Sequence, residues 1–553
     1  MLHLQKYLEK KYITQIQLDV AYKISSTSKH NIDDILLACG FVTSKEVAII
    51  KSERLNISYV DLKKFIPHEE ALSLLERKKA IELTVLPLMI SSDKLVISID
   101  ERNDFKHKEY LERITGKEVQ FVISSKKEIL NHLMTHEYFT QDDETLQKIN
   151  ELKKRSEQNI DIVNLVDLLI EDAIEDSASD IHISPEKDIV NVFFRIDGVL
   201  KHYHTLPKEF QERIISRIKI LAKLDISQTS LPQDGQIEYI HLHSNFRLRV
   251  STIATSYGEN IVMRLLKNSV SDLSIDSLGL LKKNKILLKK LFKQPNGLIL
   301  VTGPTGSGKT TTLYSALKEI NSLRKNILTV EDPIEYQIPF IKQTQINVKV
   351  GYTFDNALRA FMRQDPDVIL VGEIRDEETA ALALRASITG HLVLSTLHTN
   401  DAVGAIGRLV DLGIAEYLVG SATIAILAQR LVRKLCPHCK EKVKDTQKEL
   451  TKYDIPNELI NSTENLQIYE AKGCDKCSQT GYNSRVMILE ILQVDKQVEE
   501  MISNKKSSLN ILNYVKSKGM RSMLDDGYKK VLEGITSFEE IQRTVQDREF
   551  LEG

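Results

Sequence analysis

The spacing of apolar and polar positions divides the chain into several α/β segments. Residues 1–140 contain helical patterns at 33–37 and 44–50, followed by short runs of β-type apolar residues between 83 and 123. Residues 141–159 are strongly polar and carry almost no apolar stripe, which is typical of a linker or a solvated helix. We therefore expect a separate N-terminal domain over 1–140 and a linker over 141–159.

A second α/β pattern covers residues 160–270. It begins with an apolar-periodic helix, continues with an alternating strand at 190–196 and a helix near 210–224, and ends with strands between 235 and 266. From residue 298 to about 430, strand and helix segments alternate, which predicts a parallel sheet with crossover helices. The third domain is expected over 271–553.

Composition supports a multidomain globular protein. A chain of 553 residues exceeds what one core usually organises, and 42% hydrophobic with 27% charged residues excludes collagen-like and largely disordered chains. The formal net charge of -2 gives no bulk basicity that would indicate nucleic acid or an anionic membrane. No secretory signal and no apolar stretch of about 18 residues is evident. We expect a cytoplasmic protein that reaches membranes through partners.

Residues 303–310 carry the clearest chemical signal. They match G-x-x-x-x-G-K-[ST] at every defined position and stand between an apolar strand and a helix, which disfavours a fortuitous glycine-rich turn. In such a loop, backbone N–H groups surround the β-phosphate, Lys309 reaches the β- and γ-phosphates, and Thr310 can bind Mg²⁺. We expect ATP and Mg²⁺ to be bound by Gly303, Pro304, Thr305, Gly306, Ser307, Gly308, Lys309, Thr310 and Thr311.

Acidic residues follow two other apolar strands. Glu373 ends the run 367–373, where a phosphate-loop ATPase places the acid that orders magnesium or the attacking water. Glu331, Asp332 and Glu335 follow the apolar run 327–330 and are a second candidate cluster for water or magnesium, with a plain acidic turn as the alternative. His398 follows a further strand and is a candidate γ-phosphate sensor or a structural histidine.

Four of the five cysteines form two C-x-x-C pairs within 433–485. In a cytosolic chain this arrangement favours a closed Cys₄ site for a structural zinc ion over a disulfide or chance pairing. The spacer between the pairs exceeds the usual zinc-ribbon range, so we expect it to hold a helical insert. The predicted metal ligands are Cys436, Cys439, Cys474 and Cys477.

Taken together, these motifs resemble the bacterial secretion ATPase superfamily, which includes the type II secretion and type IV pilus assembly ATPases. The segments that resemble its Walker A, aspartate box, Walker B and histidine box are 303–312, 329–336, 365–380 and 390–401. The segments that resemble the domain before its core are 177–185, 194–200, 231–237 and 247–266. The resemblance implies an α/β fold with a RecA-like P-loop ATPase core, a preceding PAS-like domain and a separate N-terminal domain.

The resemblance also implies partners and further site residues. It implies a homohexamer that hydrolyses ATP held between two domains and moves an inner-membrane platform protein, to which the N-terminal domain docks. Such a protein is cytoplasmic and peripherally associated with the inner membrane. Four arginines match positions that the family directs at phosphate or across the subunit contact: Arg249, Arg264, Arg359 and Arg363. The cysteine pairs resemble those of assembly and export members and favour polymerisation over retraction.

Two features limit the range of functions. Residues 31–43 resemble the family's amino-terminal helical element but lack the Arg-Leu-Gly opening of its cyclic di-GMP-binding members, which leaves platform docking as the implied role. The alternative function is a DNA translocase or conjugative traffic ATPase, which predicts nucleic-acid contact surfaces. The chain has no Trp, and its Tyr and Phe residues are scattered. We therefore expect no specific nucleic-acid partner.

Overall fold

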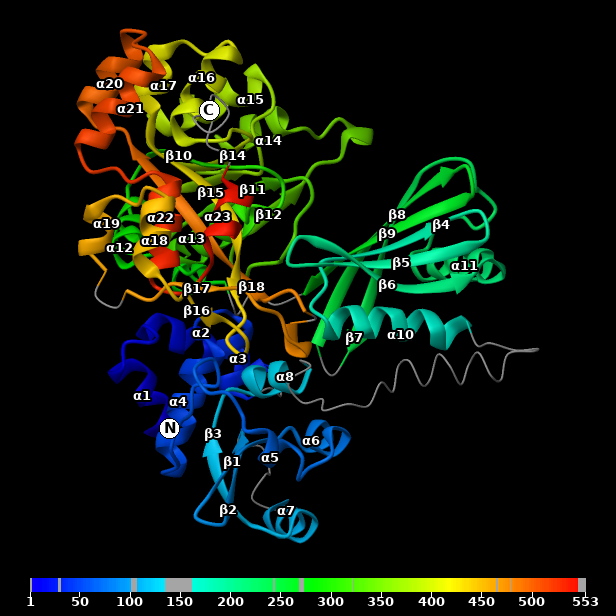
Figure 1. The fold of residues 1–553 in the computed structure, drawn as a ribbon. Helices are drawn as coiled ribbons and strands as arrows, with labels where there is room; N and C mark the ends of the chain where they lie inside the picture. Colours follow the sequence, from blue (N-terminus) through cyan, green and yellow to red (C-terminus); the bar gives the residue numbers. More distant parts are fainter. Residues whose placement is uncertain are drawn as a thin grey trace. The chain divides into compact units, whose positions relative to one another are not determined.

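The computed structural model shows two compact units, Met1–Ser271 and Asp272–Gly553 (Figure 1). It describes residues 2–27, 31–100, 107–134, 162–241, 244–267, 273–321, 323–463, 466–477 and 479–545. The expected linker at 141–159 lies outside these residues. Within them, no helix has both the length and the apolar character needed to cross a bilayer.

The first part of unit 1 is a small helical cluster followed by a three-stranded sheet. The helices are α1 (Leu2–Glu9), α2 (Gln15–Thr27), α3 (Ile32–Ala38), α4 (Ser44–Leu55), α5 (Glu69–Leu72), α6 (Arg77–Leu83), α7 (Lys108–Thr115) and α8 (Lys126–Met134). The sheet runs β1 (Leu86–Ser91), β2 (Lys94–Ile99), β3 (Glu118–Ile123). Thr43 and Glu46 form a capping box that fixes the start of α4. The expected helices at 33–37 and 44–50 are confirmed.

The second part of unit 1 packs two helices on an antiparallel sheet. Its sheet order is β6-β5-β4-β9-β8-β7, and Figure 1 shows α10 lying along the sheet. The elements are α10 (Ile162–Glu175), β4 (Asp180–Pro185), β5 (Ile189–Ile196), β6 (Val199–Pro207), α11 (Gln211–Leu221), β7 (Gln233–His241), β8 (Ser244–Thr255) and β9 (Gly258–Lys267). Val190, Val192 and Phe194 are all buried, so the alternating apolar residues of this segment form the inward face of β5.

Unit 2 is built on a seven-stranded sheet of order β12-β11-β13-β14-β10-β15-β18. The first six strands are parallel and β18 is antiparallel to β15. The strands are β10 (Gly297–Thr302), β11 (Ile327–Glu331), β12 (Lys342–Gln345), β13 (Val368–Val371), β14 (Leu392–Leu397), β15 (Thr423–Leu435) and β18 (Tyr482–Gln493). Every residue of β10, β13 and β14 is buried, as expected for parallel strands covered on both faces.

Helices connect and cover these strands (Figure 1). They are α12 (Lys282–Leu291), α13 (Lys309–Ile320), α14 (Phe354–Phe361), α15 (Glu377–Ile388), α16 (Ala402–Asp411), α17 (Glu416–Ala422), α20 (Lys496–Ser503), α21 (Ser508–Ser517), α22 (Met523–Leu532) and α23 (Phe538–Thr544). The predicted parallel sheet with crossover helices is confirmed. Because parallel strands end at the same edge, the segments that follow β10, β11, β13 and β14 meet there.

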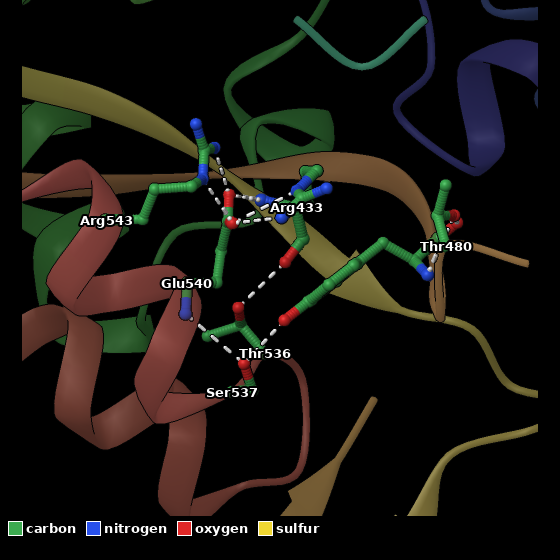
Figure 2. Close-up of polar contacts among 7 residues, drawn as sticks. Arg433, Thr480, Thr536, Ser537, Glu540 and Arg543 are labelled. Atoms are coloured by element: carbon green, nitrogen blue, oxygen red, sulfur yellow. Dashed lines mark hydrogen bonds and ion pairs between the residues drawn. The ribbon is translucent and has the colours of Figure 1, made fainter. Parts of the chain in front are cut away.

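The cysteine-containing insert lies between β15 and β18. It holds β16 (Glu441–Lys442), α18 (Thr446–Lys452), α19 (Asn457–Asn461) and β17 (Tyr469–Glu470), so the expected helical insert is confirmed. Figure 2 shows Arg433 and Arg543 both directed at Glu540. Arg433, on β15, donates to the fully buried carboxylate of Glu540 at 2.8 Å and lies over the Tyr482 ring. These contacts join Arg433, where the insert begins, to α23.

Candidate ATP site and tetracysteine site

The loop between β10 and α13 has the backbone geometry of a phosphate cradle. Gly303 has φ 146°, and a Cβ there would lie 2.5 Å from the carbonyl oxygen of Gln429. Gly308 has φ 88° and caps the N-terminus of α13. Lys309 Nζ donates to the carbonyl oxygens of Gly303 at 2.8 Å and Pro304 at 3.1 Å. The lysine therefore lies folded along the loop that would receive the phosphates.

A glutamine that the sequence analysis did not identify supports this loop. Gln429 on β15 is fully buried, and its amide donates to the Ser307 carbonyl oxygen at 2.8 Å. Its side-chain oxygen accepts a hydrogen bond from Thr312 Oγ1 at 2.9 Å. Pro304, Thr305 and Gly306 remain exposed above it. The loop thus has a fixed base and an open face.

A cavity of about 170 Å³ lies beside the loop. It brings together seven predicted site residues, which are Lys309, Thr310, Glu331, Asp332, Glu335, Glu373 and His398. It is also lined by Leu313, Tyr314, Pro333, Phe354, Leu370, Gly372 and Thr396, which were not singled out. Thr311 is exposed on the first turn of α13 and does not line the cavity. Carboxylate and hydroxyl oxygens are ligands that Mg²⁺ prefers, so this donor set fits that ion.

Glu373 and His398 lie together at the ends of neighbouring strands. The Glu373 carboxylate is ion-paired with Arg375, and its Oε2 lies 3.7 Å from His398 Nε2. Burial lowers the pKa of His398, and the charge of Lys309 lowers it further. Burial also lowers the pKa of Lys309, an effect that Glu373 opposes. The lowered pKa leaves the imidazole of His398 neutral at neutral pH.

Glu331 is the most enclosed of the predicted acids. It ends β11 with only 4% of its surface exposed, whereas Asp332 is exposed and Glu335 is half-buried. Its carboxylate accepts hydrogen bonds from Thr329 Oγ1 at 2.5 Å and from the Tyr314 hydroxyl. Burial raises the pKa of Glu331, and these donors oppose that rise. Glu331 is thus held in place by two side-chain hydroxyl groups.

The four predicted arginines lie on both units. Arg249 on β8 and Arg264 on β9 belong to unit 1, where Arg264 Nε donates to Asp180 Oδ1 at 2.9 Å. Arg359 on α14 is ion-paired with Glu378, and Arg363 is exposed just after α14. None of the four lines the described cavity.

The four predicted cysteine ligands come together in space. Their Sγ atoms all lie within 4.8 Å of one another, and three of the separations are 3.8 to 3.9 Å. A disulfide has an S–S bond of about 2.05 Å, so all four are free thiols. A zinc tetrahedron with bonds of about 2.3 Å has S···S edges of about 3.8 Å, so the cluster fits that ion.

Backbone groups also point at these sulfur atoms. The N–H groups of Cys474 and Gly481 donate to Cys477 Sγ at 3.2 and 3.1 Å, and Gly473 N–H donates to Cys439 Sγ at 3.4 Å. Such donors stabilise thiolates, which are the form of cysteine that binds metal.

Comparison with known proteins identifies the family. Residues 155–543 match the family model described as type II/IV secretion system protein, and residues 55–142 match that of the MshEN domain. The chain belongs to the type II/IV secretion system protein family. The expectation drawn from the four core motifs is therefore confirmed.

Relatives in this family carry names that specify the chemistry. The type II secretion system ATPase E of Vibrio cholerae is 45% identical over 72% of this chain and 78% of its own. The type IV pilus assembly ATPase PilB of Myxococcus xanthus is 36% identical over 96% of this chain and 97% of its own. The chain is therefore an ATPase of the secretion and pilus assembly group, with a RecA-like P-loop core.

A solved structure supports the fold independently. The ATPase DotB of Yersinia pseudotuberculosis aligns with a TM-score of 0.53 at 21% identity, covering 70% of this chain and 96% of its own. At this identity the match concerns the fold alone, and it agrees with a P-loop core that follows a smaller α/β domain.

Proposed function

We propose that the chain is a Mg²⁺-dependent motor ATPase that powers assembly of pilin or pseudopilin subunits for type IV pilus formation or type II secretion. The observation that carries this proposal is the cavity beside the phosphate loop, which gathers Lys309, the predicted acids and His398. Relatives of the chain are named as type II secretion and pilus assembly ATPases. The two C-x-x-C pairs also resemble those of assembly members.

The proposed reaction is in-line attack of water on the γ-phosphate, which yields ADP and phosphate. Loop N–H groups and Lys309 neutralise the phosphate oxygens. Glu373 is the first candidate for ordering the attacking water, with Glu331 and Glu335 as the alternatives. Thr310 and Asp332 would hold a magnesium ion, which would shield the charge of the phosphates. His398, kept neutral by its surroundings, is placed to detect the γ-phosphate.

The proposed assembly is a homohexameric ring with ATP between the PAS-like domain and the core. We assign the N-terminal domain to 1–140, the PAS-like domain to 160–270 and the core to 271–553 with its insert at 433–485. Opening and closing of these domains moves an inner-membrane platform protein, to which the N-terminal domain docks. The ring is cytoplasmic and peripherally bound to the membrane through this partner, with no specific nucleic-acid partner.

Two sets of residues support this assembly in the proposal. Arginine suits contact with phosphate because its planar guanidinium stays charged and donates several hydrogen bonds. We assign this role, or contact with the neighbouring subunit, to Arg249, Arg264, Arg359 and Arg363. A structural zinc ion is assigned to the tetracysteine cluster, where it stabilises the insert.

The test of this function is the substitution Glu373→Gln. The variant keeps the size of the side chain but cannot act as a carboxylate, so we expect it to bind ATP normally and to hydrolyse it about a hundredfold more slowly. Binding and single-turnover hydrolysis are measured together, with Glu377→Gln, an acid of the first turn of α15 that does not line the cavity, as the control. Normal hydrolysis by Glu373→Gln would transfer the role to Glu331 or Glu335.

A further inference from the structure

The carboxylate of Glu331 is held by side chains from three elements. Thr329 on β11 donates at 2.5 Å and Gln343 on β12 donates through Nε2 at 3.1 Å. The third donor is the hydroxyl of Tyr314 on α13. Both oxygens of the carboxylate are engaged, since Thr329 and Gln343 contact Oε1 and Tyr314 contacts Oε2.

Tyr314 contacts both ends of the acidic segment. It is 1% exposed, and its hydroxyl accepts a hydrogen bond from the backbone N–H of Glu335 at 3.1 Å. Its ring packs edge-on against Tyr336 at 5.7 Å between centroids. It also lies on the helix that begins with Lys309. One buried side chain therefore links the phosphate-loop helix to both Glu331 and Glu335.

We propose that Tyr314, assisted by Gln343, is a positioning residue that fixes the Glu331 carboxylate at the ATP cavity in its ionised form. This inference rests on the proposed function, and within it on the alternative in which Glu331 serves the hydrolysis of ATP. Neither residue needs to touch ATP, because each acts through the carboxylate. The hydroxyl of Tyr314 makes the contact that phenylalanine could not make.

The arrangement has a consequence for pH dependence. A hydrogen bond donated to a carboxylate favours its charged form, whereas burial and the neighbouring Glu335 disfavour it. Charged or titratable groups that line the same cavity are Lys309, Asp332, Glu373 and His398. Removing the hydroxyl raises the pKa of Glu331 further above its usual range. The variant should then lose activity mainly toward acidic pH.

The test is the pH profile of kcat for Tyr314→Phe. We expect the acid limb of kcat to move up by about one pH unit, so that kcat falls up to about tenfold on that limb, while kcat above it and the KM for ATP stay within about twofold. Tyr482→Phe is the matched control, because it removes a partly buried hydroxyl contact to Ser537 and Tyr482 does not line the cavity. A wild-type profile, or an equal loss at every pH, would overturn the proposal.

Two further variants test the proposal by other routes, one through the second donor and one through the acid itself. Should Tyr314→Phe fail to fold, Gln343→Leu removes the second donor, and an unchanged acid limb overturns the proposal while an upward shift supports it. Glu331→Gln distinguishes a failure of the proposed role of Glu331 from a failure of the proposed role of Tyr314. If it keeps wild-type turnover, the role of Glu331 fails along with the inference; if it loses turnover while Tyr314→Phe does not, the inference alone fails.

Discussion

At the scale of single residues, local backbone and charge requirements determine which residues stand in the phosphate loop. Gly303 has a positive φ and cannot accept a Cβ, and Lys309 is the first residue of α13. The supporting residues were not predictable in this way. Tyr314, Gln343 and Gln429 act through partners on other elements, and such residue types are common in buried positions without a catalytic role.

Lys309 provides the most direct prediction at this scale. Lys309→Ala removes a cation from the phosphate loop, so we expect turnover to fall by at least about a hundredfold. Steady-state phosphate release measures the effect, and Lys293→Ala, an exposed lysine shortly before β10, is the control. Turnover at the wild-type rate would mean that the loop does not take part in the reaction.

At the scale of elements, apolar periodicity located helices and strands but not their order in space. The helices at 33–37 and 44–50 and the strand at 190–196 follow directly from the spacing of apolar residues. The sheet order of unit 2 does not, because strand pairing joins segments far apart in the chain. The antiparallel pairing of β18 with β15 brings together residues on either side of the cysteine insert.

The tetracysteine cluster was predictable because two C-x-x-C pairs, which supply four identical ligand residues, are by themselves the sequence pattern of a Cys₄ metal site. The cluster around Glu540 was not, since it joins Arg433 on β15 to Arg543 and Ser537 near the C-terminus (Figure 2). These contacts connect the cysteine-containing insert to α23. Loss of the metal should therefore weaken the packing of that helix.

We expect about one zinc ion per chain, and we expect its removal to lower the thermal midpoint by roughly 5 °C. Elemental analysis and thermal unfolding before and after chelation measure both quantities. Cys474→Ser should reproduce the loss of metal and of stability, whereas Cys39→Ser, outside the cluster, should do neither. Wild-type protein that is purified without added chelator and contains no zinc would contradict this prediction.

At the scale of the whole molecule, the family was predictable because four motifs occur in one order and spacing. The family match over residues 155–543 confirms it. The roles of the arginines depend on longer-range geometry. Arg249 and Arg264 lie in unit 1, while Arg359 and Arg363 lie in unit 2. The roles of all four arginines stay predictions.

The central claim is that this ATPase drives assembly of a secretion or pilus apparatus and does not move DNA. The most direct measurement is steady-state ATP hydrolysis by the purified chain at fixed ionic strength, with and without single- or double-stranded DNA, and with Lys309→Ala as the blank. We predict slow Mg²⁺-dependent turnover that DNA leaves unchanged and that rises with the membrane partner or acidic lipid. Strong stimulation by DNA would contradict the account and support a translocase.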